Sequence, residues 1–165
     1  AAIAFRDGGY GTPVLVGRSE RIAEMIAQSS LADAAGLEVV NARVSPHNKL
    51  YSERLYARLQ RQGFLARDVQ RMVNQDRNIF AACMVAEGHA DAMVTGVTRS
   101  FYVCLDDATK VFDARDGQTL MAVSILIARG RTVLIADTSV HELPSSEQLA
   151  DFAVQCASIT RHLGH

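Results

Sequence analysis

The sequence predicts an α/β fold, a layered and mostly parallel sheet to which one antiparallel hairpin is added. Short apolar runs bounded by Pro or Gly alternate with longer segments whose apolar residues recur every three or four positions, as buried strands and amphipathic helices do. Two of these runs, 120–128 and 132–136, are joined by a short link around Gly130, which favours a hairpin. With 48% hydrophobic and 21% charged residues, the chain has the composition of one globular domain with a sizeable core.

The first part of the chain alternates predicted helices and strands. Each strand is a short apolar run next to Pro or Gly, and each helix carries apolar residues at steps of three and four. Along the chain these are a helical fragment at 1–5 with a turn at 7–11, a strand at 12–17, a helix at 19–27, a strand at 37–41, and a helix from about residue 49 that Gly63 ends.

The longest predicted helix covers 69–88, where a single polar residue, Asp76, interrupts an apolar stripe. A strand at 92–96, a helix at 103–112, the two strands of the hairpin and a last helix at 145–164 complete the prediction. The last helix is well marked, because Ser145 and Gln148 have the spacing of a capping box after Pro144.

Charge and composition lower the expectation for several classes of partner. The chain has 17 Lys and Arg against 18 Asp and Glu, a formal net charge of −1, so no basic field attracts nucleic acid or an anionic membrane. Its apolar runs are shorter than the roughly 20 residues of a spanning helix, and it opens on no signal-like pattern. We therefore expect a cytoplasmic protein that binds neither nucleic acid nor membrane.

The cysteines and histidines do not suggest a metal site. Three widely spaced cysteines fit buried thiols in a reducing compartment, and five histidines are scattered without ligand spacing. These residues are Cys83, Cys104, Cys156, His47, His89, His141, His162 and His165.

The first candidate site is the loop after the strand expected at 92–96. Gly96 permits a close backbone approach, Thr98 and Ser100 offer hydroxyls, and Arg99 offers a fork for a phosphate or carboxylate. The plainer interpretation is an ordinary loop in which Thr98 or Ser100 caps the next helix.

The second candidate site is the segment 137–142, which follows the second strand of the hairpin. Asp137 and Thr138 are candidate binding residues, and Asp137 with His141 has the composition of an acid–base pair. The plainer interpretation makes Asp137 a loop-fixing acceptor and His141 an exposed residue. Because ligands collect at the carboxyl ends of strands, we expect both loops on the same edge of the sheet.

A polar patch, 74–78, lies on the long predicted helix. Asp76 and the neighbouring Arg77 suggest an interface or binding feature, whereas the plainer interpretation is a solvated helix face. No nucleophile elbow, P-loop or dinucleotide fingerprint is present, so the residues alone leave the function open.

The order of segments resembles the phosphate acetyl/butyryl transferase, or phosphotransacetylase, family over essentially the entire chain. Within that family, Asn74 to Phe80 and Thr98 to Ser100 are similar to the domain fused behind bacterial NADP-dependent malic enzymes. The landmarks of the family resemblance are Gly11 to Gly17, Gly88 to Gly96, Ile135 to Thr138, and the segment Pro144 to Gly164.

The resemblance implies a three-layer αβα sandwich of the kind found in isocitrate and isopropylmalate dehydrogenases. It also implies that residues 1–165 form the first part of a domain whose second half carries the serine, arginine and aspartate of acetyl transfer, so no catalytic residue is expected here. Active members are similar to one another in a basic Leu-Arg-Pro-Ala segment. This chain has Asp106 at the basic position, where a carboxylate repels phosphate.

The function implied by the resemblance is a non-catalytic, regulatory and oligomerising domain that senses acetyl-CoA or a related thioester. Its partners would be a second copy, as a dimer, and the malic enzyme portion of the same chain. No cofactor is expected in these residues, since NADP and a divalent metal would bind the upstream malic enzyme portion. Two alternatives stay open, a fragment of an active phosphate acetyltransferase and a purely structural dimerisation domain.

Overall fold

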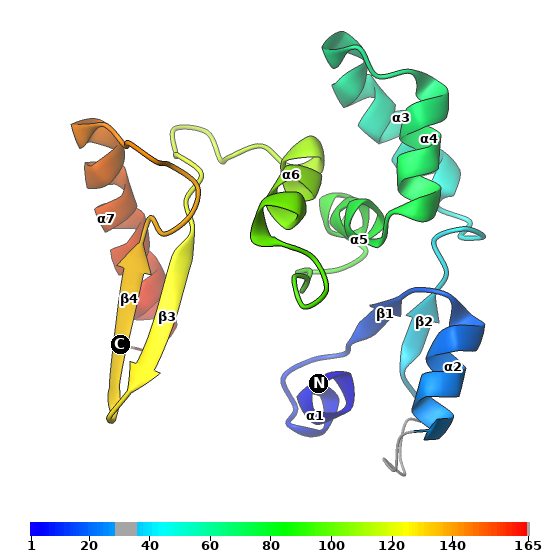
Figure 1. Cartoon of the computed structure of the whole chain (residues 1–165), viewed down its shortest axis with the longest axis horizontal. Coiled ribbons are helices and arrows are strands. Elements are labelled where there is room, and N and C mark those ends of the chain that lie inside the picture. Colours follow the sequence, from blue (N-terminus) through cyan, green and yellow to red (C-terminus); the bar gives the residue numbers. More distant parts are fainter. Residues whose placement is uncertain (29–35, 165) are drawn as a thin grey trace. The chain divides into compact units, whose positions relative to one another are not determined.

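The computed structural model describes residues 1–28 and 36–164 and divides the chain into two compact units, 1–112 and 113–165 (Figure 1). His165, one of the scattered histidines, lies outside the described residues. Among the described residues, no helix combines the length and the apolar character needed to cross a bilayer. Mixed helices and strands confirm the predicted α/β class.

The first unit begins with a small parallel sheet and two flanking helices. Val14, Leu15 and Val16 pair in parallel with Glu38, Val39 and Val40, as the two short apolar runs predict. The elements are α1 (Ala2–Asp7), β1 (Val14–Val16), α2 (Ser19–Gln28) and β2 (Glu38–Val40).

Four helices and a short 3₁₀ turn form the rest of the first unit and most of its core. They are α3 (Asn48–Leu59), η1 (Gln60–Gln62), α4 (Ala66–Gln75), α5 (Arg77–Ala86) and α6 (Phe101–Val111). Gly63 ends η1 in the left-handed region, with φ of 90°, which a side chain would disfavour. The apolar faces of these helices pack together, and the largest fully buried side chains are Tyr51, Leu59, Val69, Val73, Ile79 and Phe80.

Two predictions for this unit are wrong. The helix expected over 69–88 is two helices, because Asp76 is extended, with φ of −98° and ψ of 118°. Its Oδ1 accepts hydrogen bonds from the N–H groups of Asn78 and Ile79 at 2.8 and 3.4 Å and so caps α5. The segment 92–96 forms no strand, since no described neighbouring strand pairs with it.

The second unit is a hairpin covered on one face by a helix, β3 (Val123–Ala128), β4 (Arg131–Ala136) and α7 (Ser146–His162) (Figure 1). The strands are antiparallel with Val123 opposite Ala136, and Arg129 and Gly130 have φ of 51° and 72°, as a two-residue turn of the primed type requires. The predicted hairpin is confirmed.

The last helix also begins as predicted. Ser145 Oγ accepts from the N–H of Gln148, and Gln148 Oε1 accepts from the N–H of Ser145, which completes the capping box. From α7, Phe152 is buried, and alternate residues of β4 are shielded and exposed, so one face of the hairpin is covered and the other is open.

Candidate functional site

The loop 95–100 of the first unit is organised around Arg99. The Arg99 Nη1 donates to Asp76 Oδ2 at 2.7 Å and to Asp107 Oδ2 at 2.9 Å. Asp76 stands at the junction of α4 and α5, and Asp107 lies on α6, so one guanidinium ties three segments together. The hydrogen bond that Arg99 donates to Asp76 is the largest cause that raises the pKa of Arg99 above its usual value.

A second layer of neutral polar groups supports these charges. Asn78 is buried, its Nδ2 donates to Asp107 Oδ2 at 2.9 Å, and its Oδ1 accepts from the Thr95 hydroxyl at 2.7 Å. The Cys104 thiol lies 3.8 Å from Asn78 Nδ2 and 3.7 Å from Thr95 Oγ1. The polar atoms in this layer are therefore satisfied within the unit, as buried polar groups need to be.

The two neighbouring aspartates of α6 have different surroundings. The Asp107 side chain is 10% exposed and faces Arg99, whereas the Asp106 side chain is 68% exposed and pairs with Lys110. Asp107 Oδ1 is also 3.8 Å from Lys110 Nζ. Three carboxylates thus surround one guanidinium and one ammonium, which leaves this Arg99 cluster with a formal excess of negative charge.

The other predicted residues of this loop have local roles. Gly96 has φ of 116°, a conformation that disfavours a side chain. Ser100 is the N-cap of α6, with its Oγ 3.5 Å from the Val103 N–H, and Thr98 is exposed. The capping interpretation is therefore correct for Ser100. The solvated-face interpretation of 74–78 is wrong at Asn78, which is buried.

In the second unit, Asp137 fixes the turn that follows β4. Its side chain is 1% exposed, and its Oδ1 accepts from the N–H groups of Ala122, Ser139 and Val140 at 2.9, 3.2 and 3.3 Å. Burial opposes ionisation, but these donors and the hydrogen bonds from His141 hold the pKa of Asp137 well below its usual range. The loop-fixing interpretation of Asp137 is thus supported by the geometry.

The predicted pair of Asp137 and His141 is present as a contact. Asp137 Oδ2 lies 2.8 Å from the N–H of His141 and 2.8 Å from its Nδ1, and the ring packs 5.2 Å from that of Phe152. The contact through Nδ1 and the packing against Phe152 fix the orientation of the imidazole ring. Thr138 is exposed, and its Oγ1 accepts from the Ser124 hydroxyl at 3.1 Å.

The two loops belong to different units, so the expectation that they share one edge of a sheet stays a prediction. Within the described part of the chain, no three His, Cys, Asp or Glu side chains gather as a metal site. Sequence reasoning singled out the loop from Thr95 and the patch that contains Asn78, but it did not predict that Thr95, Asn78 and Asp107 would gather around Arg99. No sequence pattern marks these contacts, since Asn78 lies outside the apolar stripe expected over 69–88 and Asp107 adjoins Asp106 on one helix.

A comparison with models of protein families gives a match over the whole chain. The model described as phosphate acetyl/butaryl transferase matches residues 1–165. The chain belongs to this family.

Known members show which versions of the domain this chain is similar to. The NADP-dependent malic enzyme of Rhizobium meliloti (strain 1021) is 48% identical over 166 residues, which are 100% of this chain and 22% of that protein. A probable NADP-dependent malic enzyme of Rickettsia prowazekii (strain Madrid E) is 41% identical over 99% of this chain and 22% of its own length. The chain therefore spans about a fifth of the length of these relatives.

A solved phosphotransacetylase shows the same fold. The structure from Streptococcus pyogenes superposes with a TM-score of 0.81 at 23% identity, over 93% of this chain and 46% of the other. The phosphotransacetylase resemblance and the α/β class predicted from the sequence are thus confirmed.

Proposed function

We propose that this chain is part of the phosphotransacetylase-like domain of an NADP-dependent malic enzyme, and that the domain regulates and oligomerises that enzyme without transferring acetyl groups. Malic enzyme relatives at 48% and 41% identity support the first part. The oxidation of malate to pyruvate, CO₂ and NADPH, with NADP and a divalent metal, belongs in this proposal to another portion of the protein. The 165 residues correspond to the first part of the domain.

The observation that carries the non-catalytic role is the double engagement of Arg99. A phosphoryl-transfer site needs cationic groups free to hold phosphate oxygens. In this loop Arg99 Nη1 already binds Asp76 and Asp107, and Asp106 adds a third carboxylate. Because Arg99 Nη1 is held by these carboxylates, it is not free to hold the oxygens of a transferring phosphoryl group, so acetyl-phosphate formation is disfavoured here.

Acetyl-CoA or a related thioester is the proposed effector. Among the described residues, the Nε and Nη2 groups of Arg99 make no hydrogen bond, and the side chain is 28% exposed. These groups, with the backbone at Gly96 and the hydroxyls of Thr98 and Ser100, are the proposed contacts in the first unit. Asp137 and Thr138 are proposed as separate binding residues of the second unit. A single charge-assisted contact contributes about 1.5–3 kcal/mol, so losing Arg99 should weaken binding by about tenfold or more.

The test uses the full malic enzyme and titrates acetyl-CoA against binding heat and NADPH production. Arg99→Ala should lower both the affinity for acetyl-CoA and the response of NADPH production to it. Arg99→Lys keeps a positive charge beside Asp76 but has no planar guanidinium, so it distinguishes loss of the guanidinium contact from loss of folding. Arg77→Ala is the matched control, because Arg77 is an exposed residue beside the Arg99 cluster. An Arg99→Ala protein that binds and responds like wild type would contradict the effector role and favour the structural alternative.

A direct assay addresses the active-transferase alternative. Acetyl-phosphate formation from acetyl-CoA and phosphate should stay at the level of a blank. Turnover proportional to protein would show that the domain is an acetyltransferase, and the regulatory proposal would then fail.

The proposal includes a three-layer αβα architecture like that of isocitrate and isopropylmalate dehydrogenases, a dimer formed through this domain, and a cytoplasmic location. The open face of the hairpin, with Leu126 51% and Val133 50% exposed, supports a further layer there. Exposed apolar residues such as Val94 and Val97 in the first unit support an interface. Free cysteines at 83, 104 and 156 support a reducing compartment.

A further inference from the structure

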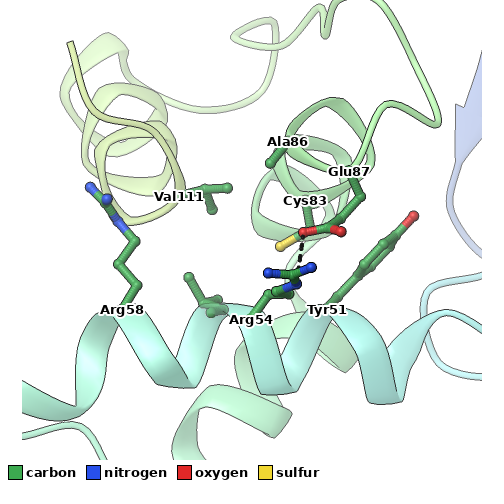
Figure 2. A pocket seen from close by; sticks show the side chains of 8 residues that line it. Tyr51, Arg54, Arg58, Cys83, Ala86, Glu87 and Val111 are labelled. Carbon is green, nitrogen blue, oxygen red and sulfur yellow. Dashed lines mark ion pairs between the residues drawn. The ribbon is translucent and has the colours of Figure 1, made fainter. Parts of the chain in front are cut away.

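A hollow of ≈ 180 Å³ lies within the first unit, between α3, α5 and the C-terminal end of α6 (Figure 2). Its apolar lining comes from Leu55, Ala86 and Val111, and charged side chains stand at its edge. The remaining lining residues are Tyr51, Arg54, Arg58, Cys83 and Glu87. Tyr51, Arg54, Leu55 and Arg58 follow helical spacing, so one face of α3 forms a whole side of the hollow.

Arg58 is fixed as part of the wall. Its Nε donates to the Lys110 carbonyl at 2.8 Å, and its Nη2 donates to the carbonyls of Thr109 and Phe112 at 3.2 and 3.0 Å. These acceptors lie at the C-terminal end of α6, where a cation is favoured by the helix dipole. Arg58 is therefore engaged in structure.

Arg54, by contrast, presents unused donors. Its side chain is 71% exposed, and its Nε stands 3.7 Å from Glu87 Oε1, an ion pair without a hydrogen bond. Among the described residues, its guanidinium makes no hydrogen bond. Figure 2 shows Arg54 and Glu87 facing each other beside the hollow. The Arg54 side chain is largely exposed, the Glu87 side chain is 22% exposed, and no hydrogen bond joins them, so the pair is weak and a competing carboxylate can replace Glu87 on Arg54.

We propose that this hollow binds a small aliphatic monocarboxylic acid, with its carboxylate on Arg54 and its chain against Leu55 and Val111. The planar guanidinium fork matches a carboxylate bidentately, which gives the orientation. At ≈ 30 Å³ for each water in the liquid, ≈ 180 Å³ corresponds to about six water-sized groups, the size of a four-carbon acid. Neither the proposed acetyl-CoA effector nor its loop is needed for this site.

The other two polar residues of the lining do not oppose such a ligand. Burial, and then the nearby Glu87 carboxylate, raise the pKa of Cys83 to about 12, and burial is the main cause that raises the pKa of Tyr51 to about 12. Both are neutral at physiological pH, and the Tyr51 hydroxyl lies 2.6 Å from His89 Nδ1. Among the described residues that line the hollow, Glu87 is therefore the one anion that the ligand meets.

The experiment titrates isobutyrate into the full chain and follows amide chemical shifts, with isobutyramide as the uncharged isostere and sodium chloride at equal ionic strength as the salt control. We expect shifts confined to residues around Leu55, Ala86 and Val111, with a Kd in the range of about 1–10 mM, since so small a ligand buries little surface. Isobutyramide should bind at least about fivefold more weakly, because it lacks the charge.

Three variants test whether the carboxylate of the ligand binds Arg54. Arg54→Gln should weaken isobutyrate binding at least about fivefold, and Glu87→Gln should tighten it, because the competing carboxylate is gone. Arg61→Gln, an exposed arginine outside the lining, should leave the Kd unchanged. Absence of saturable shifts up to about 50 mM would overturn the proposal, as would equal binding of the amide or wild-type affinity in Arg54→Gln.

Discussion

At the scale of single residues, the contacts of Arg99 depend on which of two adjacent aspartates on α6 faces inward. Asp106 and Asp107 are neighbours on α6, yet only Asp107 reaches Arg99 and Asn78. The sequence drew attention to Asp106, because the family resemblance implies a basic residue at this position in active members. Helical spacing alone does not say which of two adjacent carboxylates turns inward, since that depends on how α6 packs against α5.

Asp107→Asn should destabilise the first unit by about 1.5–3 kcal/mol, because it removes the charged acceptor of an Arg99 hydrogen bond and an ion-pair partner of Lys110. Asp106→Asn is the matched control and should cost at most about 1 kcal/mol, as expected for an exposed pair. Urea unfolding followed by circular dichroism measures both values. Equal losses for the two variants would contradict the different roles assigned to these aspartates.

Asp137 should make the free energy of unfolding depend on pH in the acidic range. Its pKa is lowered in the folded state, so its contribution is complete above the unfolded value near 3.8 and is lost as the pH falls below it. The urea midpoint of the wild type should therefore drop between about pH 5 and pH 2. Asp137→Asn should be less stable at neutral pH and lose less on acidification, whereas Asp116→Asn, at an exposed position, should follow the wild type. Parallel pH profiles for Asp137→Asn and wild type would exclude this linkage.

At the scale of elements, the features that neighbouring residues encode were predicted correctly, whereas the features that depend on distant segments were not. The capping box at Ser145 and the short link around Gly130 are encoded within a few residues, and both elements form as predicted. The helix break at Asp76 was misjudged, because its apolar stripe continues on both sides while the carboxylate caps α5. The strand expected at 92–96 failed because a strand needs a pairing partner, which its own sequence does not report.

Contacts between distant elements were likewise outside the reach of the sequence. Arg58 lies on α3, and the carbonyls that it binds lie more than 50 residues further along the chain, at separations of 51, 52 and 54. No periodicity in either segment indicates this pairing. The same limit applies to the Arg99 cluster, whose members come from the junction of α4 and α5, from a loop and from α6.

Arg58→Gln should therefore loosen the end of α6 at a cost of about 1–3 kcal/mol, because the carbonyls of Thr109, Lys110 and Phe112 lose a charged donor. Native-state hydrogen exchange should show faster exchange in the last turn of α6. Arg61→Gln, which removes the same charge at an exposed position of η1, should leave that turn protected. Unchanged exchange in Arg58→Gln would mean that this cap contributes little.

At the scale of the whole molecule, the hairpin offers a test of the proposed layered architecture. Leu126 and Val133 are cross-strand partners, and with Ile135 they lie on the face that α7 leaves open. The chain corresponds to 46% of a solved phosphotransacetylase, and an α/β sheet of this type carries layers on both faces. We therefore expect this face to be covered in the full-length protein.

Val133→Lys should then have different consequences in two contexts. In the 165-residue chain, where Val133 is 50% exposed, the change should alter the free energy of unfolding by at most about 0.5–1 kcal/mol. In the full-length protein the same change would bury an ammonium without a partner, at a cost of about 2 kcal/mol or more. Urea unfolding of both proteins measures the difference, with Val133→Thr as the β-branched control that replaces one methyl group with a hydroxyl. Equal and small effects of the lysine in both contexts would show that this face stays open to solvent, and the three-layer proposal would have to be abandoned for the hairpin.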